Sequence, residues 1–73
     1  MSAREIRVRG DGIRLGQLLQ LADVVGSGGE AKALLGTRTV TVNGEVDDRR
    51  GRQLRDGDEV VAEGAVLVVR TGG

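Results

Sequence analysis

The residues best suited to chemistry are arginines that stand close together. Arg49, Arg50 and Arg52 occupy one polar stretch in the second half of the chain. A guanidinium group can donate two parallel hydrogen bonds to one phosphate, which the ammonium group of lysine cannot do. The cluster therefore predicts contacts with a nucleic-acid backbone, and Arg14 and Gln17 are weaker candidates for the same role. The alternative is a solvated turn neutralised by nearby acidic residues, namely Asp47, Asp48 and Asp56.

A second candidate is the glycine-rich start of a predicted helix. Ser27-Gly28-Gly29-Glu30 has the S-x-x-E spacing of a capping box, in which the Ser oxygen accepts the N3 amide proton and the Glu reaches back to the cap amide. Free amide groups at a helix N-terminus attract anions, and glycines let a phosphate approach the backbone. Lys32 would add a positive charge one turn later. The alternative is a capped helix without a ligand, and the spacing differs from that of a Walker A loop.

The composition excludes several kinds of catalytic site. The chain has neither Cys nor His, which removes the usual zinc sites, Cys-His nucleophile pairs and Ser-His-Asp triads. The acidic pairs Asp47-Asp48 and Asp56-x-Asp58 lack the spacing of a calcium loop, so we interpret them as structural or solvated. We expect no metal, no cofactor and no enzymatic activity.

The size and charge of the chain indicate one small domain. Its 73 residues are 38% hydrophobic and 30% charged, as in a globular protein. The 11 basic and 11 acidic residues cancel, but their clustering allows a basic face and an acidic face on one domain. No apolar run approaches the roughly 20 residues of a membrane span, and the N-terminus lacks the apolar core of a signal peptide. We expect a cytoplasmic monomer that is not attached to a membrane.

The elements that must position the candidate residues begin with a strand and a helix. Residues 5–9 alternate in polarity, with Ile6 and Val8 on one face, and predict an edge strand. A helix is predicted from residue 13 to about residue 23, because apolar residues recur at helical spacing. That apolar stripe consists of Leu15, Leu18, Leu19 and Ala22.

A second helix and a hairpin follow. The helix is predicted to begin after Ser27 and to end at Gly36, which would adopt the left-handed conformation of a helix C-terminus. Residues 39–42 and 45–46 flank Asn43-Gly44, a pair that tolerates the two positive φ angles of a type I′ hairpin turn. The pattern therefore predicts two antiparallel strands joined by a tight turn.

The last third of the chain predicts further strands. Residues 47–52 are expected to form a flexible polar loop, after which Leu54 returns to the core. Strands are predicted over residues 60–62 and 65–69, joined at Glu63-Gly64. The predicted fold class is α+β, with two short helices packed on a small, mainly antiparallel sheet.

In this order, the features resemble the S-four RNA-binding domain, also called the alpha-L motif, and in particular its short stand-alone bacterial members. The resemblance is strongest over residues 13–61 of a single domain that spans residues 1–73, while residues 65–73 would form an extra strand and a frayed tail. The segments that carry it are Arg14 to Leu19, Ser27 to Lys32, Val40 to Glu45, Arg49 to Leu54 and Gly57 to Val60.

The resemblance implies non-catalytic binding of structured RNA, ribosomal or transfer RNA, through the two helices and the following hairpin loop. Gln17, Gly28 and Gly29 depart from the family, which often has basic residues at such positions. The chain also has no aromatic residue for base stacking, which favours readout of phosphates and RNA shape. The residues expected to bind RNA are Arg14, Gln17, Ser27, Gly28, Gly29, Lys32, Asn43, Arg49, Arg50 and Arg52.

Two other functions fit parts of the sequence. The terminal Gly72-Gly73 after a predicted strand resembles ubiquitin-like or sulfur-carrier proteins of the β-grasp fold, which use a free terminal glycine. That alternative does not explain the capped second helix or the arginine cluster, and a frayed end also explains the two glycines. A protein-interaction module without RNA is the third possibility.

Overall fold

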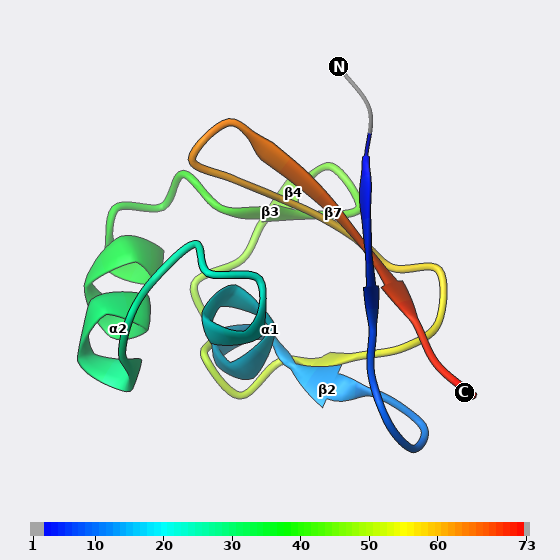
Figure 1. Cartoon of the computed structure of the whole chain (residues 1–73). Coiled ribbons are helices and arrows are strands. Elements are labelled where there is room, and N and C mark those ends of the chain that lie inside the picture. Colours follow the sequence, from blue (N-terminus) through cyan, green and yellow to red (C-terminus); the bar gives the residue numbers. More distant parts are fainter. Residues whose placement is uncertain (1–2, 73) are drawn as a thin grey trace.

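Two short helices pack against a five-stranded sheet in the computed structural model, which describes residues 3–72 (Figure 1). The elements are β1 (Arg4–Arg7), β2 (Ile13–Arg14), α1 (Leu15–Leu21), α2 (Gly28–Gly36), β3 (Thr41–Val42), β4 (Glu45–Val46), β5 (Gln53–Leu54), β6 (Glu59–Ala62) and β7 (Ala65–Arg70). The large sheet has the order β1-β7-β6-β3-β4, and only its β1–β7 pair is parallel. Strands β2 and β5 form a separate antiparallel pair. The predicted α+β class with a mainly antiparallel sheet is confirmed.

Strand β1 lies at an edge of the sheet, as predicted. Ile6 and Val8 are buried, while Arg7 and Arg9 are exposed. The strand itself covers Arg4–Arg7, and the amide of Val8 still donates to the carbonyl of Arg70 at 2.8 Å. Because β1 pairs only with β7, the first and last strands lie side by side, in blue and orange in Figure 1.

Helix α1 is shorter than predicted. Its expected first turn is taken by β2, in which Ile13 pairs with Leu54 and Arg14 with Gln53. The helix ends at Leu21, and Asp23 has a positive φ of 60°. The predicted apolar stripe is nevertheless buried, so the periodicity identified the packed face correctly while long-range strand pairing set the start of the helix.

Helix α2 begins as predicted but ends differently. The Ser27 Oγ accepts a hydrogen bond from the Glu30 amide at 3.1 Å, while the Glu30 Oε1 accepts from the Gly26 amide rather than from that of Ser27. The prediction that Gly36 ends the helix in a left-handed conformation is wrong. Gly36 is the last helical residue, Thr37 caps the helix, and Arg38 has the positive φ of 61°. The Thr37 hydroxyl, which donates to the carbonyl of Leu34 at 2.6 Å, stabilises this later end.

The predicted turns and core are confirmed. Asn43 and Gly44 have φ angles of 51° and 87°, and Glu63 and Gly64 have 51° and 77°, as type I′ turns require. Leu54 is fully buried. No helix within residues 3–72 has the length and apolarity to cross a membrane. The core combines the apolar faces of both helices with the inner face of the sheet, including Leu15, Leu18, Leu19, Leu35, Val40, Val60, Leu67 and Val69.

Candidate nucleic-acid interface

The loop of residues 47–52 lies directly on the start of α1. The amide of Leu15 donates to the carbonyl of Arg52 at 2.8 Å, and that of Gly16 donates to the carbonyl of Arg50 at 2.9 Å. A helix leaves its first amide groups without intrahelical partners, so these contacts satisfy two of them. A Cβ on Gly16 would lie 2.4 Å from the Cγ of Arg50, which shows that glycine permits this close approach.

The docked loop and α1 enclose a groove that extends to the start of α2. Its volume is about 370 Å³. It brings together four of the residues expected to bind RNA, namely Arg14, Gln17, Gly28 and Arg50. Gln20 was missed as a site residue, although it follows Gln17 by one helical turn and could have been recognised by that spacing. We call this surface the basic groove, and it is lined by Arg14, Gly16, Gln17, Gln20, Gly28, Arg50 and Gly51.

Two guanidinium groups in the basic groove are available to a ligand. Arg14 and Arg50 are exposed, and neither forms an ion pair with an acidic residue in the described part of the chain. The Gln17 Oε1 accepts a hydrogen bond from the Arg14 amide at 3.3 Å, which caps α1 and orients the Gln17 side chain. The groove therefore offers two cationic groups and amide donors to one polyanion.

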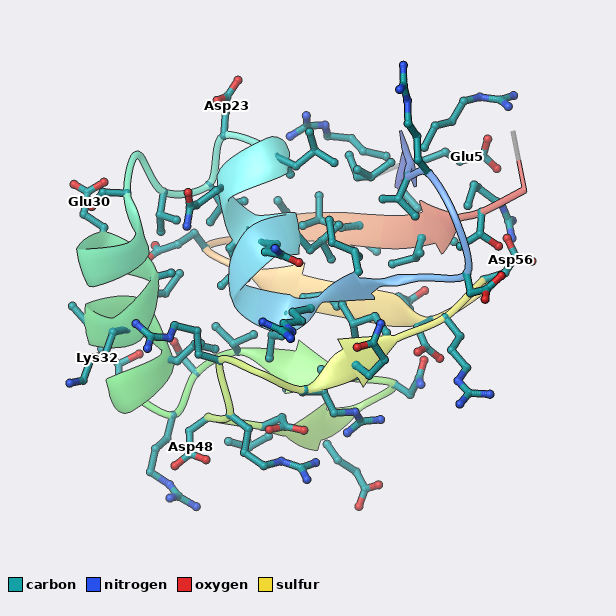
Figure 2. The ribbon with its side chains drawn as sticks, turned by 90° about the horizontal axis from the view of Figure 1, so that it is seen from below. Glu5, Asp23, Glu30, Lys32, Asp48 and Asp56 are labelled. Atoms are coloured by element: carbon teal, nitrogen blue, oxygen red, sulfur yellow. The ribbon has the colours of Figure 1, made fainter. Side chains whose placement is uncertain are left out.

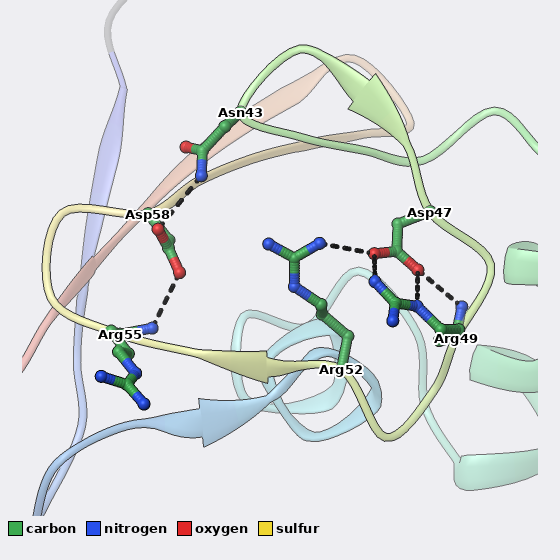
Figure 3. A network of polar contacts seen from close by, with 6 residues as sticks. All are labelled: Asn43, Asp47, Arg49, Arg52, Arg55 and Asp58. Atoms are coloured by element: carbon green, nitrogen blue, oxygen red, sulfur yellow. Dashed lines mark hydrogen bonds and ion pairs between the residues drawn. The ribbon is translucent and has the colours of Figure 1, made fainter.

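Arg49 and Arg52 are instead held by Asp47 (Figure 3). The Asp47 carboxylate accepts hydrogen bonds from Arg49 at 2.8 and 3.1 Å and from Arg52 at 2.7 Å. Only 7% of Asp47 is exposed. Hydrogen bonds from the Arg49 side chain and backbone, together with Arg52, hold the pKa of Asp47 well below its usual range despite the opposing effect of burial. We call these three residues the Asp47 cluster.

The Asp47 cluster corrects one expectation about the loop. Residues 47–52 were expected to be flexible, but the Arg49 amide also donates to the Asp47 Oδ1 at 2.9 Å, which fixes the turn. The interpretation of Asp47 as a structural carboxylate is confirmed. Two guanidinium groups on one carboxylate leave the cluster with a net charge of about +1. Of the three clustered arginines, Arg50 is the one turned to the basic groove.

Asn43 belongs to a different structural unit. Its Nδ2 donates to the Asp58 Oδ1 at 3.1 Å (Figure 3). Its Oδ1 accepts from the Glu59 amide at 2.9 Å. Burial raises the pKa of Asp58, but hydrogen bonds from the Arg55 amide and from Asn43 outweigh it and lower that pKa overall. Both polar ends of the Asn43 side chain are thus engaged in holding the hairpin turn against β6.

The N-terminal cap of α2 satisfies only some of the free amide groups at the start of the helix. Ser27 satisfies the Glu30 amide, whereas the amides of Gly28 and Gly29 have no acceptor among the described residues. Gly28 lines the basic groove, and a Cβ there would be 3.6 Å from the Gln20 Nε2. Lys32 lies on the outer side of α2, away from α1, and is not part of the groove (Figure 2).

Comparison with known proteins places the chain in a family. A family model described as "S4 domain" matches residues 6–70, which extends the resemblance seen over residues 13–61 into β1 and β7. The chain is also 52% identical over 62 residues to a Bacillus subtilis (strain 168) protein named "Probable ribosome maturation protein RlbA", covering 85% of this chain and 87% of that protein. Neither finding favours the β-grasp alternative, whose Gly73 lies outside the described residues. The chain belongs to the S4 domain family.

Proposed function

We propose that this protein binds structured RNA without catalysing a reaction, and that the basic groove is the centre of its RNA-binding face. The observation that carries the proposal is the convergence of Arg14 and Arg50 on one concave surface, beside the unoccupied amides at the start of α2. Phosphate contacts supply most of the affinity of such proteins, and guanidinium groups and helix N-termini are typical donors.

The shape of the groove favours a folded RNA over a single strand. The chain contains no aromatic side chain on which bases could stack. Gln17 and Gln20 can donate and accept hydrogen bonds, which suits the 2′-hydroxyl groups that line the minor groove of double-stranded RNA. We therefore infer that recognition depends on the spacing of phosphates and sugars along an A-form surface.

Ribosomal RNA is the RNA class that we propose first. The printed name of the Bacillus subtilis relative refers to ribosome maturation, and the alignment covers most of both chains. Transfer RNA is the second candidate from the family resemblance. A role on ribosomal RNA would place the protein in the cytoplasm.

The decisive experiment measures RNA affinity as a function of salt. We would titrate folded ribosomal RNA hairpins and a transfer RNA, and verify by mass spectrometry that the RNA is unchanged after incubation. With about three phosphates neutralised, by Arg14, by Arg50 and by the net charge of the Asp47 cluster, the slope of log K against log salt should be roughly −2.1 to −2.7. Replacing Arg14 and Arg50 by Ala should flatten the slope by about one to two units.

The matched control removes two arginines elsewhere. Arg7 and Arg9 are exposed at β1 and the turn that follows it, and they do not line the basic groove. Their joint replacement by Ala should leave the slope nearly unchanged. If both double variants weakened binding equally, net charge rather than the basic groove would govern affinity and the proposed face would be wrong.

A further inference from the structure

A second groove lies on the other side of the segment that joins the two helices. It has a volume of about 500 Å³ and runs between residues 23–26, α2 and the β6–β7 turn. Its floor is apolar, because Val24, Val25 and Leu34 line it. Val24 and Val25 are only half buried and pack against the edge of the core, so their outer surfaces face the groove.

The rim of this groove is acidic. Asp23, Glu30 and Glu63 line it, and none of them forms an ion pair with a basic residue in the described part of the chain. Figure 2 shows Asp23 just beyond the end of α1 and Glu30 at the start of α2, on the same side of the molecule. We call this surface the acidic groove.

One of the rim carboxylates occupies a position where the backbone favours other residues. Glu63 has a positive φ of 51°, which glycine, asparagine or aspartate adopts at lower cost. Asp23, whose φ of 60° aspartate tolerates, follows the C-terminus of α1, where the helix dipole disfavours negative charge. The backbone at position 63 and the helix dipole at position 23 therefore do not account for the carboxylates found there.

We propose that the acidic groove docks a polypeptide segment that carries aliphatic side chains flanked by lysine or arginine. Aliphatic side chains would cover Val24, Val25 and Leu34, and cationic groups would meet the carboxylates of the rim. The occupant is argued from this charge complementarity, which also disfavours RNA because its phosphates would face three carboxylates. The inference does not depend on the proposed RNA-binding function.

The position of the acidic groove adds a consequence for the whole domain. Gly26 and Glu30 line the acidic groove, while Gly28 lines the basic groove, so the two surfaces flank the same end of α2. A protein with a basic, partly aliphatic segment could therefore be held next to RNA on one small domain.

The test is an amide NMR titration of the full chain with a synthetic peptide, acetyl-Lys-Leu-Arg-Leu-Lys-amide. We expect shifts at residues 23–26, 33–37 and 63. Two comparison peptides separate the contribution of the apolar floor from that of the acidic rim. One has serine in place of both leucines, and the other has glutamate in place of the three basic residues. Both should bind more weakly at these residues than the basic aliphatic peptide.

Substitutions on the rim and floor test the same surface. Ala33 is an exposed residue of α2 that lines the acidic groove, so Ala33→Arg would fill the groove with a cationic side chain while keeping helix propensity. We expect it to weaken peptide binding about tenfold or more. Glu63→Gln should weaken binding about 1.5- to 5-fold, as for one exposed charge pair. Glu45→Gln, at an exposed carboxylate of β4 outside the groove, is the matched control and should have no effect.

Four results would overturn the proposal. The first is no localised shift at the acidic groove with the basic aliphatic peptide. The second is that the serine peptide binds as tightly as the basic aliphatic peptide, or that Glu45→Gln weakens peptide binding as much as Glu63→Gln does. Either outcome would mean non-specific charge attraction. The third is concentration-dependent shifts at these residues without peptide, which would assign the groove to self-association. The fourth is a shift of the same amides by an RNA hairpin, which would make the groove part of the RNA-binding face.

Discussion

The Asp47 cluster and the basic groove use the same residue type for opposite purposes. The guanidinium groups of Arg49 and Arg52 form ion pairs with a buried carboxylate and fix the loop. Arg50, between them in sequence, has no such partner among the described residues and lines the groove. Arg14 joins Arg50 from the neighbouring β2 strand. The difference shows that the number of arginines in a loop overstates its capacity for phosphate, because part of the charge serves the fold.

The largest effect is expected from removing the carboxylate at the centre of the cluster. Asp47→Ala should lower the free energy of unfolding by about 1.5–3 kcal/mol, since it removes charge-assisted hydrogen bonds to two arginines and a backbone amide. Arg50→Ala should change it by less than about 0.5 kcal/mol, as at an ordinary surface position. Urea unfolding measures both. Similar values for the two variants would contradict the division of roles.

Acid should weaken the Asp47 cluster, which depends on a carboxylate, and spare the basic groove, which no carboxylate lines. The pKa values of Asp47 and Asp58 are lowered in the folded state, so their stabilising contribution is complete above the unfolded pKa of about 3.9 and is lost as the pH falls below it. The free energy of unfolding should therefore be flat above about pH 5 and decline in more acidic solution. In Asp47→Asn this decline should be smaller, because only Asp58 and weaker contributors remain. An unchanged decline would show that Asp47 does not titrate with folding.

A smaller effect separates the two kinds of arginine in RNA binding. Arg50→Ala should weaken binding about five- to 30-fold, as for one lost charge-assisted contact of roughly 1–2 kcal/mol. Arg49→Ala should weaken it less than about threefold, because Arg49 is already engaged by Asp47. Fluorescence anisotropy at fixed salt measures both constants. A larger loss of RNA affinity in Arg49→Ala than in Arg50→Ala would mean that the Arg49 side chain leaves Asp47 to bind RNA. The roles assigned to the two arginines would then be wrong.

The smallest effect tests how the loop is docked on α1. Gly16→Ala would place a Cβ against the Arg50 side chain and displace it, so RNA binding should weaken a few-fold, by about 1 kcal/mol. Gly36→Ala is the control, because a Cβ there meets nothing within 4 Å. It should stabilise the protein by about 0.5–1 kcal/mol through helix propensity and leave RNA binding unchanged. Equal RNA affinity of Gly16→Ala and the unaltered chain would exclude a role for this contact.

Local features of the fold were predictable from the sequence because their causes are local. Asn43-Gly44 required a type I′ turn, the serine at position 27 capped α2, and the spacing of leucines identified the buried face of α1. The start of α1 was not predictable in this way, because Ile13 joins a strand pair with Leu54, 41 residues later. Gly36 was misread because Thr37, whose hydroxyl donates to the Leu34 carbonyl, caps α2, so that Gly36 keeps a helical conformation.

The candidate site was predictable in its residue types but not in its arrangement. Sequence reasoning selected Arg14, Gln17, Gly28 and Arg50, which the structure brings to one groove. It could not separate Arg50 from its neighbours, because the burial of Asp47 depends on the packing of the whole loop. Asn43 and Lys32 lie outside the groove, since one side chain clamps a turn and the other points away from α1.

The interior place of β7 in the sheet has a consequence for how this protein folds during synthesis. β7 is the last strand along the described chain, yet it lies between β1 and β6 and is the only strand that pairs with β1. Strand β1 therefore has no sheet partner until about residue 70 has left the ribosome. Until then Ile6 and Val8 have no β7 residues to pack with, so the domain should complete its core after translation reaches its last strand rather than progressively.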